Sequence, residues 1–304
     1  MKSTTPLIQS ASCEDIEHIF DGHLCPPTLE IAGGWMCESI KFVSDAQGEK
    51  SKPDYDSVPV TLWYPANADA VVEHQIEMGN EDDPFWCYLW PTARTLSEQV
   101  FRAVRSHPTP TPPNNDTPSA PNTPSSLRVL ETGCGIGLVG LAALAAGATK
   151  VTFQDLRSRS VDLALHNARV NDFGDRSFGE AFDWRSPIHQ TYDWIIASDI
   201  LYHTPAHKPL LNFLTNAIVQ SAAIVPPANI TKSYPLNKDL PAALNDLGLD
   251  GTVWIGDPGR REAVTFMRLA QTRFQIYLFD AEGTPLSSPN QGKYQLIVLQ
   301  PRFV

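Results

Sequence analysis

The fold is decided by residues 127–138, whose sequence is LRVLETGCGIGL. An apolar strand signal at 127–130 leads into a loop with three glycines, and an Ala/Leu-rich helix signal follows at 138–146 and ends at Gly147. Glycines between a strand and a helix let the backbone turn sharply and let a ligand approach closely. The spacing is G-x-G-x-G, and Leu138 stands where the dinucleotide fingerprint G-x-G-x-x-G requires glycine. The segment therefore predicts a strand–loop–helix unit that binds something other than a dinucleotide.

Two carboxylates flank this loop in the sequence. Glu131 stands just before the first glycine, where its charge would repel a pyrophosphate and attract an α-ammonium group or, through water, a sulfonium. Asp155 follows the next strand, where a carboxylate can accept hydrogen bonds from both ribose hydroxyls. Glu131, the glycines and Asp155 together favour S-adenosylmethionine over a dinucleotide. A glycine loop that binds nothing remains the alternative.

Strand and helix signals alternate through the rest of the chain. We expect, in order, a strand at 151–153, a helix at 158–170, a strand at 194–197, a helix at 210–218, a strand at 253–255, a helix at 261–272 and strands at 274–279 and 294–299. The last two apolar runs are joined by a loop rich in Gly, Pro, Ser and Asn, which is typical of an antiparallel hairpin. The alternation predicts an α/β fold with a Rossmann-like, mostly parallel sheet and a C-terminal antiparallel hairpin.

The chain is expected to divide into an N-terminal extension, residues 1–80, and a domain over residues 81–304. Residues 31–64 of the extension carry β-strand signals. Apolar residues at helical spacing predict a helix before residue 106. Residues 106–126 contain seven prolines and no large apolar side chain, so they cannot offset the entropy of ordering. We expect this segment to be a disordered insertion within the domain.

Composition excludes several classes of protein. The 304 residues carry a net charge of −11, with 42% apolar and 19% charged residues, which is enough to build a core. An acidic chain argues against binding nucleic acid through a basic surface, and no apolar run reaches the roughly 20 residues of a membrane span. The five cysteines are odd in number, and no two are separated by two residues, which argues against a disulfide framework or a zinc ribbon. We expect a monomer of the cytoplasm or nucleus.

From residue 85 onward the chain resembles the class I, seven-β-strand methyltransferases that use S-adenosylmethionine. Trp90-Pro91, the segment Phe182-Asp183-Trp184, and residues 198–202 with the sequence SDILY resemble the family-16 protein methyltransferases, most of which modify lysine. Residues 256–260, GDPGR, look like the branch that methylates the β-subunit of electron-transfer flavoprotein. The resemblance implies a seven-stranded sheet and N-methylation of a protein lysine.

The resemblance also implies roles for individual residues. Asp199 and Tyr202 match the family's D-x-x-Y positions at the junction of methyl donor and acceptor, where a carboxylate or phenol can orient a neutral amine. Asp183 and Trp184 are expected at the adenine. The expected cofactor-binding residues are Trp90, Glu131, Gly133, Gly135, Gly137, Asp155, Asp183 and Trp184. The structural alternatives are a helix cap for Asp199 and core packing for Tyr202 and Trp90.

Other functions remain open from the sequence. One is a small-molecule N-methyltransferase on the same fold, and another is a non-catalytic scaffold that acts through residues 1–80. A metal site is not expected, because Pro205 separates His203 from His207 and the glutamate of an H-E-x-x-H motif is missing.

Overall fold

The computed structural model describes residues 27, 31–43, 57–79, 84–106, 127–218 and 244–302. Its centre is a seven-stranded sheet with the strand order β5-β4-β3-β6-β7-β9-β8. The strands are β3 (Arg128–Thr132), β4 (Lys150–Asp155), β5 (Ser177–Ala181), β6 (Trp194–Ser198), β7 (Thr252–Asp257), β8 (Phe274–Phe279) and β9 (Gln295–Pro301). The first five are parallel, and β9 pairs antiparallel with both β7 and β8. The predicted Rossmann-like sheet and its C-terminal hairpin are confirmed.

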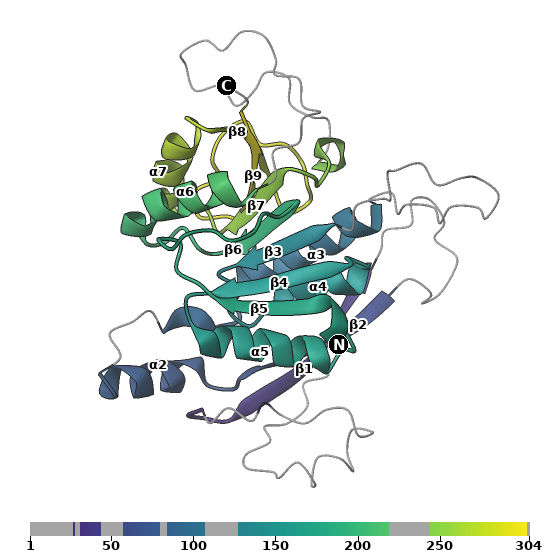
Figure 1. Cartoon of the computed structure of the whole chain (residues 1–304), viewed down its shortest axis with the longest axis vertical. Helices are drawn as coiled ribbons and strands as arrows, with labels where there is room; N and C mark the ends of the chain where they lie inside the picture. Colours follow the sequence, from purple (N-terminus) through teal and green to yellow (C-terminus); the bar gives the residue numbers. More distant parts are fainter. Residues whose placement is uncertain are drawn as a thin grey trace, which may run out of the picture.

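Helices cover both faces of this sheet (Figure 1). One layer holds α3 (Pro91–Ser106), α4 (Leu138–Ala146) and α5 (Ser158–Arg169), and the other holds α6 (His207–Ala217) and α7 (Arg261–Ala270). Successive strand residues point to opposite faces, so Trp194 packs in the first core and Ile195 in the second. Burial on both faces explains why the central strands are continuous apolar runs.

The predicted helix at 138–146 is α4, and its bounds agree with the prediction. All but one of its residues are buried, because β3 and β4 of the sheet and the neighbouring helix α3 pack against it. The helix ends at Gly147, which has φ +112° and donates its N–H to the carbonyls of Ala143 and Leu144. Only glycine adopts this conformation readily, which is why the sequence marks the end of the helix so clearly.

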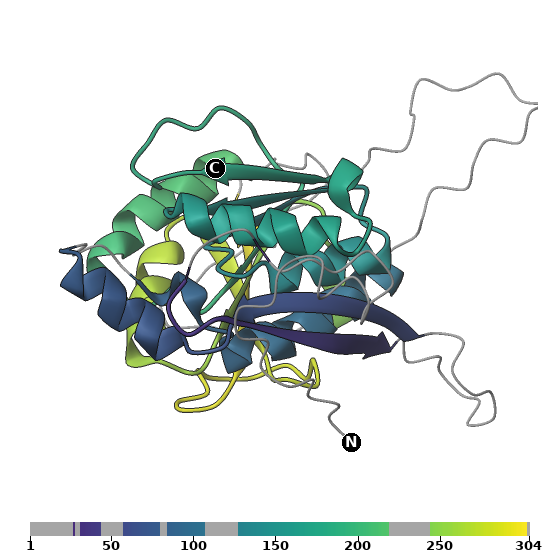
Figure 2. The same ribbon diagram turned by 90° about the horizontal axis from the view of Figure 1, so that it is seen from below.

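The N-terminal part forms an antiparallel pair of strands, β1 (Trp35–Val43) and β2 (Ser57–Pro65). The pair lies along the outer side of the helical layer that contains α5, as Figure 2 shows. Its inward side chains, among them Phe42 and Leu62, belong to the same hydrophobic core as Phe101 of α3. Phe42 and Phe101 stack with ring centroids 5.3 Å apart. The pair is therefore held by apolar burial against the helices of the sheet.

Two elements were missing from the sequence-based prediction. Helix α2 (Ala68–Glu77) buries only Val71, so its apolar pattern is too weak to predict a helix. Strand β5 is short, lies at the edge of the sheet and contains Gly179, a residue depleted in strands. A Cβ at Gly179 would lie 2.5 Å from Val161, so glycine allows α5 to pack closely on this strand.

The predicted proline-rich insertion lies outside the residues that the structure describes. Ser106 ends α3, and residues 107–126 are not among the described residues.

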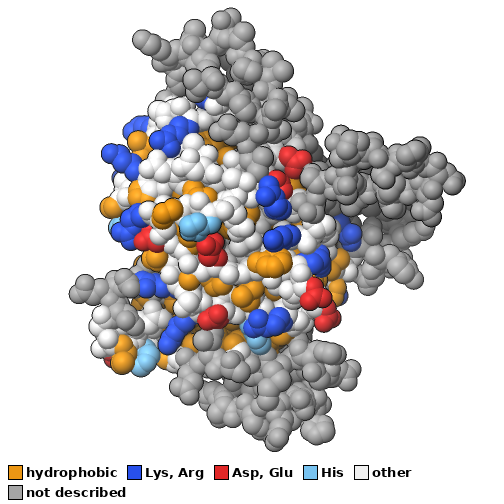
Figure 3. Space-filling model, in the orientation of Figure 1, with side chains coloured by type: hydrophobic (Ala, Val, Ile, Leu, Met, Phe, Trp, Pro, Cys, Tyr) orange, Lys and Arg blue, Asp and Glu red, His pale blue; other side chains and the backbone are white. Residues whose placement is uncertain are grey.

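None of the described helices is long and apolar enough to cross a membrane. On the face shown in Figure 3, Lys and Arg side chains lie among Asp and Glu side chains over the described surface.

Candidate functional site

The order of the strands places the candidate residues at one edge of the sheet. After β3 the chain continues outward through β4 and β5, and it then returns to the other side of β3 with β6 and β7. Ligands of open parallel sheets bind at the carboxyl ends of the strands beside such a reversal. The strands β4, β3 and β6 are adjacent in the sheet. Asp155 is the last residue of β4, and Gly133 and Asp199 directly follow β3 and β6. The topology therefore brings together residues that are 66 positions apart in the sequence.

The glycine loop joins β3 to α4 and needs each of its glycines. Gly133, Gly135 and Gly137 have φ values of +64°, +52° and +85°, which other residues rarely adopt. A Cβ at Gly133 would lie 2.6 Å from Ile200, and one at Gly137 would lie 2.6 Å from Ala164. At Gly135 the nearest contact would be the Trp86 carbonyl oxygen at 3.3 Å. The outer glycines thus serve the packing of the loop, while Gly135 has the most space beside it.

Asp155 binds the glycine loop directly. Its Oδ2 accepts a hydrogen bond from the Gly135 N–H at 3.0 Å, and its Oδ1 accepts one from the Arg157 N–H at 3.0 Å. The buried Ser160 hydroxyl donates to the Gly135 carbonyl at 2.7 Å, so both peptide groups of this glycine are held. The carboxylate is partly exposed, and a carboxylate offers about four sites for accepting hydrogen bonds. Asp155 can therefore accept further hydrogen bonds from a ligand.

Glu131 lies inside β3, beneath the loop. It is 2% exposed, and its Oε2 accepts a hydrogen bond from the Gly140 N–H of α4 at 2.8 Å. Burial raises the pKa of this carboxyl group to about 8, with a smaller contribution from the charge of Asp155. The side chain ties the first turn of α4 to the strand, and it supports the loop from below.

Trp184 covers the start of the same loop. Its indole N–H donates to the Thr132 hydroxyl at 2.9 Å, and its ring passes beside Gly133. Asp183 instead turns to its neighbour Arg185, with which it makes an ion pair at 2.6 Å. Hydrogen bonds from the Arg185 side chain lower the pKa of Asp183. Of the two residues expected at the adenine, Trp184 is the one in contact with the glycine loop.

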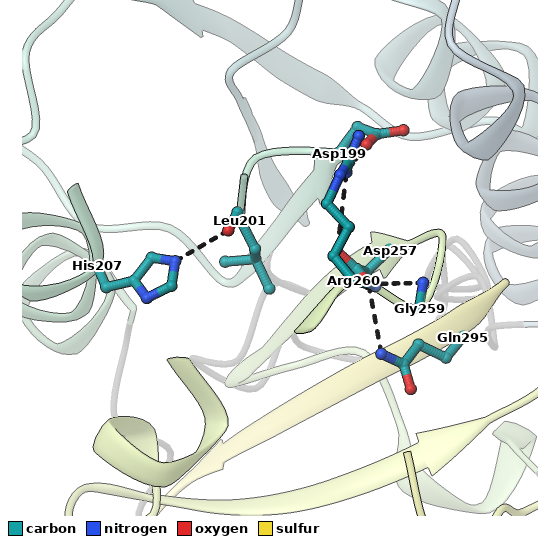
Figure 4. Close-up of polar contacts among 7 residues, drawn as sticks. All are labelled: Asp199, Leu201, His207, Asp257, Gly259, Arg260 and Gln295. Atoms are coloured by element: carbon teal, nitrogen blue, oxygen red, sulfur yellow. Dashed lines mark hydrogen bonds and ion pairs between the residues drawn. The ribbon is translucent and has the colours of Figure 1, made fainter. Parts of the chain in front are cut away.

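Asp199 lies at the end of β6 and is 5% exposed (Figure 4). Its backbone has φ +63°, a conformation in which Asp is enriched among non-glycine residues. The carboxylate pairs with the guanidinium of Arg260, which stands just before α7. Asp257 at the end of β7 is fully buried, and burial raises its pKa. The ion pair of Asp257 and Arg260 is long, at 3.9 Å, and Arg260 contacts Asp199 more closely.

Four aromatic rings form a cluster that includes Tyr202, three residues after Asp199. Tyr202 and Phe85 meet edge to face with centroids 6.3 Å apart, and they are 41% and 42% exposed. Phe85 also contacts Tyr88 and Trp90, at 6.2 and 6.5 Å. Trp90 is half-buried, so its side chain belongs to this cluster and not to the interior of the sheet. The cluster brings residues from before α3 to the loop that follows β6.

Within the described ranges, the remaining titratable groups do not form a metal centre or a reactive thiolate. His207 is buried, and its Nε2 lies 2.9 Å from the Leu201 carbonyl oxygen, as drawn in Figure 4. Among the described residues, no three His, Cys, Asp or Glu side chains are grouped so that they could hold a metal ion. Burial raises the pKa of the Cys134 thiol well above its usual value, which disfavours a reactive thiolate in the loop.

Sequence reasoning missed three polar residues that build this site: Thr132, Ser160 and Asn167. Each is fully buried, and each bonds to the loop or to a side chain that covers it. Their signal was a polar residue within an apolar strand or on the apolar face of a helix. A buried polar residue needs a partner, but the partner is distant in the sequence, so the pattern alone could not identify it.

Three features define a Rossmann-like, nucleoside-binding class of α/β protein. They are a glycine loop at the reversal of a parallel sheet, a carboxylate on the adjacent strand and a polar residue across the reversal. The chain belongs to the lysine methyltransferase family, whose model matches residues 74–232, just over half of its length. The matched range includes the glycine loop, Asp155, Asp199 and Tyr202. It ends before β7, so residues 256–260 lie beyond it.

Individual relatives match smaller parts. The chain is 27% identical over 173 residues to the protein N-terminal and lysine N-methyltransferase EFM7 of Cryptococcus neoformans. The matched region covers 52% of this chain and 50% of that protein. It is 35% identical over 99 residues to a histidine protein methyltransferase 1 homolog of Dictyostelium discoideum, which covers 30% and 31%. The chain thus spans half or less of the length of these relatives. Among solved structures it resembles the ribosomal protein L11 methylase of Lactobacillus delbrueckii, with a TM-score of 0.41, 16% identity and 71% and 81% coverage.

Proposed function

We propose that this protein transfers a methyl group from S-adenosylmethionine to a nitrogen of a protein side chain, with lysine as the acceptor. The observation that carries the proposal is the meeting of the glycine loop, Asp155 and Asp199 at the reversal point of the sheet. Membership of the lysine methyltransferase family supports it. The names of the relatives, which are protein methyltransferases, favour a protein over a small molecule as acceptor.

The residues at this edge fit S-adenosylmethionine. The partly exposed carboxylate of Asp155 suits two ribose hydroxyls. Gly135 has no side chain, and its Cβ position is the least crowded of the three loop glycines, which suits a ligand that approaches the backbone closely. Trp184 offers an aromatic surface next to the loop. Glu131 supports the loop from below, and Gly133 and Gly137 allow its close packing. Trp90 belongs to the same aromatic cluster as Tyr202. Bound there, the cofactor supplies an activated methyl group on a sulfonium.

The protein's own contribution is alignment and exclusion of water, because methyl transfer is an in-line displacement. Asp199 offers a carboxylate oxygen that can accept a hydrogen bond from an uncharged acceptor amine. Tyr202, three residues after Asp199, and Phe85 present partly exposed rings against which an alkyl side chain can pack. These roles for Asp199 and Tyr202 are part of the proposal.

The acceptor can be defined more narrowly from residues 256–260. The sequence GDPGR resembles the branch that methylates the β-subunit of electron-transfer flavoprotein. We therefore propose that the acceptor is a lysine of a folded protein similar to this β-subunit. The relatives also include enzymes named for N-terminal and histidine methylation. Mass spectrometry of the methylated acceptor distinguishes the three nitrogens, and a methyl group on histidine or on an α-amine would contradict the lysine assignment.

Calorimetry with S-adenosylmethionine and S-adenosylhomocysteine tests the proposal. We expect micromolar binding to the wild type and binding at least about tenfold weaker to Asp155→Asn, because hydrogen bonds to a charged group contribute roughly 1.5–3 kcal/mol. Asp162→Asn is the matched control, since Asp162 is exposed on α5 and should bind like the wild type. The absence of binding at millimolar ligand in a folded sample would refute the enzyme assignment and favour the scaffold.

We further propose that the protein is a monomer of the cytoplasm or nucleus and binds neither nucleic acid nor membrane. The support is the acidic net charge of −11 and the free state of Cys37, Cys87 and Cys134 within the described part of the chain. Light scattering of the purified protein and imaging of a tagged chain test these statements.

A further inference from the structure

Asp199 is almost completely enclosed by the protein. Its side chain is 3% exposed, and its N–H donates to the Gly256 carbonyl at 2.9 Å, which joins the end of β6 to β7. A buried carboxylate without a partner is unfavourable. The ion pair with Arg260 compensates the charge and also restricts the direction in which the carboxylate points.

Arg260 is held by a turn with its own set of buried contacts. Oδ1 of Asp257 accepts hydrogen bonds from the N–H groups of Gly259 at 2.7 Å and of Arg260 at 2.8 Å. Gln295 of β9 lies 3.4 Å from the same oxygen (Figure 4). Gly259 has φ +79°, and a Cβ there would lie 2.0 Å from the Asn290 carbonyl oxygen. This turn therefore fixes the backbone of Arg260 and directs its side chain towards Asp199.

We propose that Arg260 is a positioning residue for methyl transfer, acting through Asp199 to aim one carboxylate oxygen at the acceptor nitrogen. The inference rests on the proposed function. Three strands contribute to the arrangement: β6 leads directly into Asp199, β7 leads into the turn, and β9 supplies Gln295. The Arg260 side chain is 25% exposed, less than the other ion-paired arginines Arg94, Arg128 and Arg185. In this proposal Arg260 touches the carboxylate of Asp199 and acts through it, without touching the reacting atoms.

A double-mutant cycle on Arg260 and Asp199 tests this inference. Transfer of tritium from labelled S-adenosylmethionine to the protein fraction of a cell lysate is measured for Arg260→Met, Asp199→Asn and the double variant. We expect each single change to lower the rate about 100-fold, as a displacement near 1 Å can. The double variant should lose less than about threefold more, because residues that act as one unit are not additive. Multiplied losses in the double variant would overturn the proposal.

Three further measurements separate positioning from a general effect on structure. S-adenosylhomocysteine should bind to Arg260→Met within about threefold of the wild type, whereas equal losses of affinity and rate would contradict positioning. Arg260→Lys keeps the cation and should recover about tenfold over Arg260→Met, and no recovery would count against the proposal. Arg261→Met changes an exposed arginine one position along and should behave as the wild type.

The same variants also report without activity. In thermal unfolding, the double variant should melt no lower than the less stable single variant, because both changes remove the ion pair of Arg260 with Asp199, and the longer contact with Asp257 is already lost in Arg260→Met. Additive losses of melting temperature would show that the two side chains act independently. If the wild type neither binds S-adenosylhomocysteine nor transfers methyl groups, the proposed function fails, while the unfolding cycle still decides whether Arg260 and Asp199 are coupled.

Discussion

The side-chain amide of Asn167 on α5 makes the same two hydrogen bonds to Trp63 of β2 that a neighbouring strand would make. Its Oδ1 accepts from the Trp63 N–H at 2.8 Å, and its Nδ2 donates to the Trp63 carbonyl at 2.9 Å. The second Nδ2 hydrogen donates to the Ile136 carbonyl of the glycine loop at 3.0 Å. One fully buried amide thus links the N-terminal strand pair to the candidate cofactor site.

We expect Asn167→Ala to lower the free energy of unfolding by about 3 kcal/mol, because three backbone groups lose their buried partner and each loss costs roughly 1–3 kcal/mol before relaxation. Urea unfolding measures the change. Asn216→Ala removes an exposed amide on α6 that bonds to Asn212 of the same helix, and it should cost less than about 0.5 kcal/mol. Equal stability of Asn167→Ala and the wild type would show that the link is not stabilising.

Gly133→Ala should be strongly destabilising for two reasons that can be separated. Its φ of +64° strains any L-residue, and its Cβ would lie 2.6 Å from Ile200. We expect a loss above about 3 kcal/mol in chemical denaturation. Gly147→Ala also has positive φ but has nothing within 4 Å of the new Cβ, so only about 1 kcal/mol should be lost. Ile200→Ala removes the side chain that the new Cβ would meet. Gly133→Ala should therefore lower the free energy of unfolding less in an Ile200→Ala background than in the wild type, and an equal loss would argue against the steric clash.

The buried Glu131 predicts a pH dependence of stability. Its pKa in the folded protein is about 8, above its usual value of 4.5, so the folded state holds the proton more tightly than the unfolded state. The stabilisation is complete below pH 4.5 and is lost as the pH rises to 8, with a slope of at most about 1.4 kcal/mol per pH unit. Glu131→Gln removes this titration, so its stability should fall less steeply between pH 5 and 8.

Urea unfolding at several pH values measures the two slopes. Glu98→Gln, an exposed change on α3, should keep the slope of the wild type. A Glu131→Gln slope equal to that of the wild type would mean that Glu131 does not titrate in this range.

Local patterns were sufficient for most of the helices and strands. The helix at 138–146 was predicted with its observed bounds, because apolar side chains fill it and Gly147 ends it. The central strands were apolar runs because both of their faces are buried. Helix α2 and strand β5 were missed, because each buries little surface and so leaves little periodic signal.

The sequence allowed one part of the candidate site to be predicted as a unit, and it gave no indication of how the other residues pair. The glycines and Asp155 lie within one strand–loop–helix–strand unit, and a spacing along the chain describes their relation. The pairing of Asp199 with Arg260, and of Tyr202 with Phe85, joins loops from different elements. Such pairs depend on how the strands are ordered in the sheet, which no local pattern records.

The sequence by itself determined the class of fold, the glycine loop and the carboxylate on the next strand, because each follows from short-range periodicity and backbone sterics. Only the tertiary structure decided the partner of each buried polar group. Glu131 supports α4, Asn167 holds the N-terminal strands, and Arg260 turns to Asp199. The physical reason is that a buried polar atom must find a partner in space, and the nearest one in space is set by the packing of the sheet and its helices.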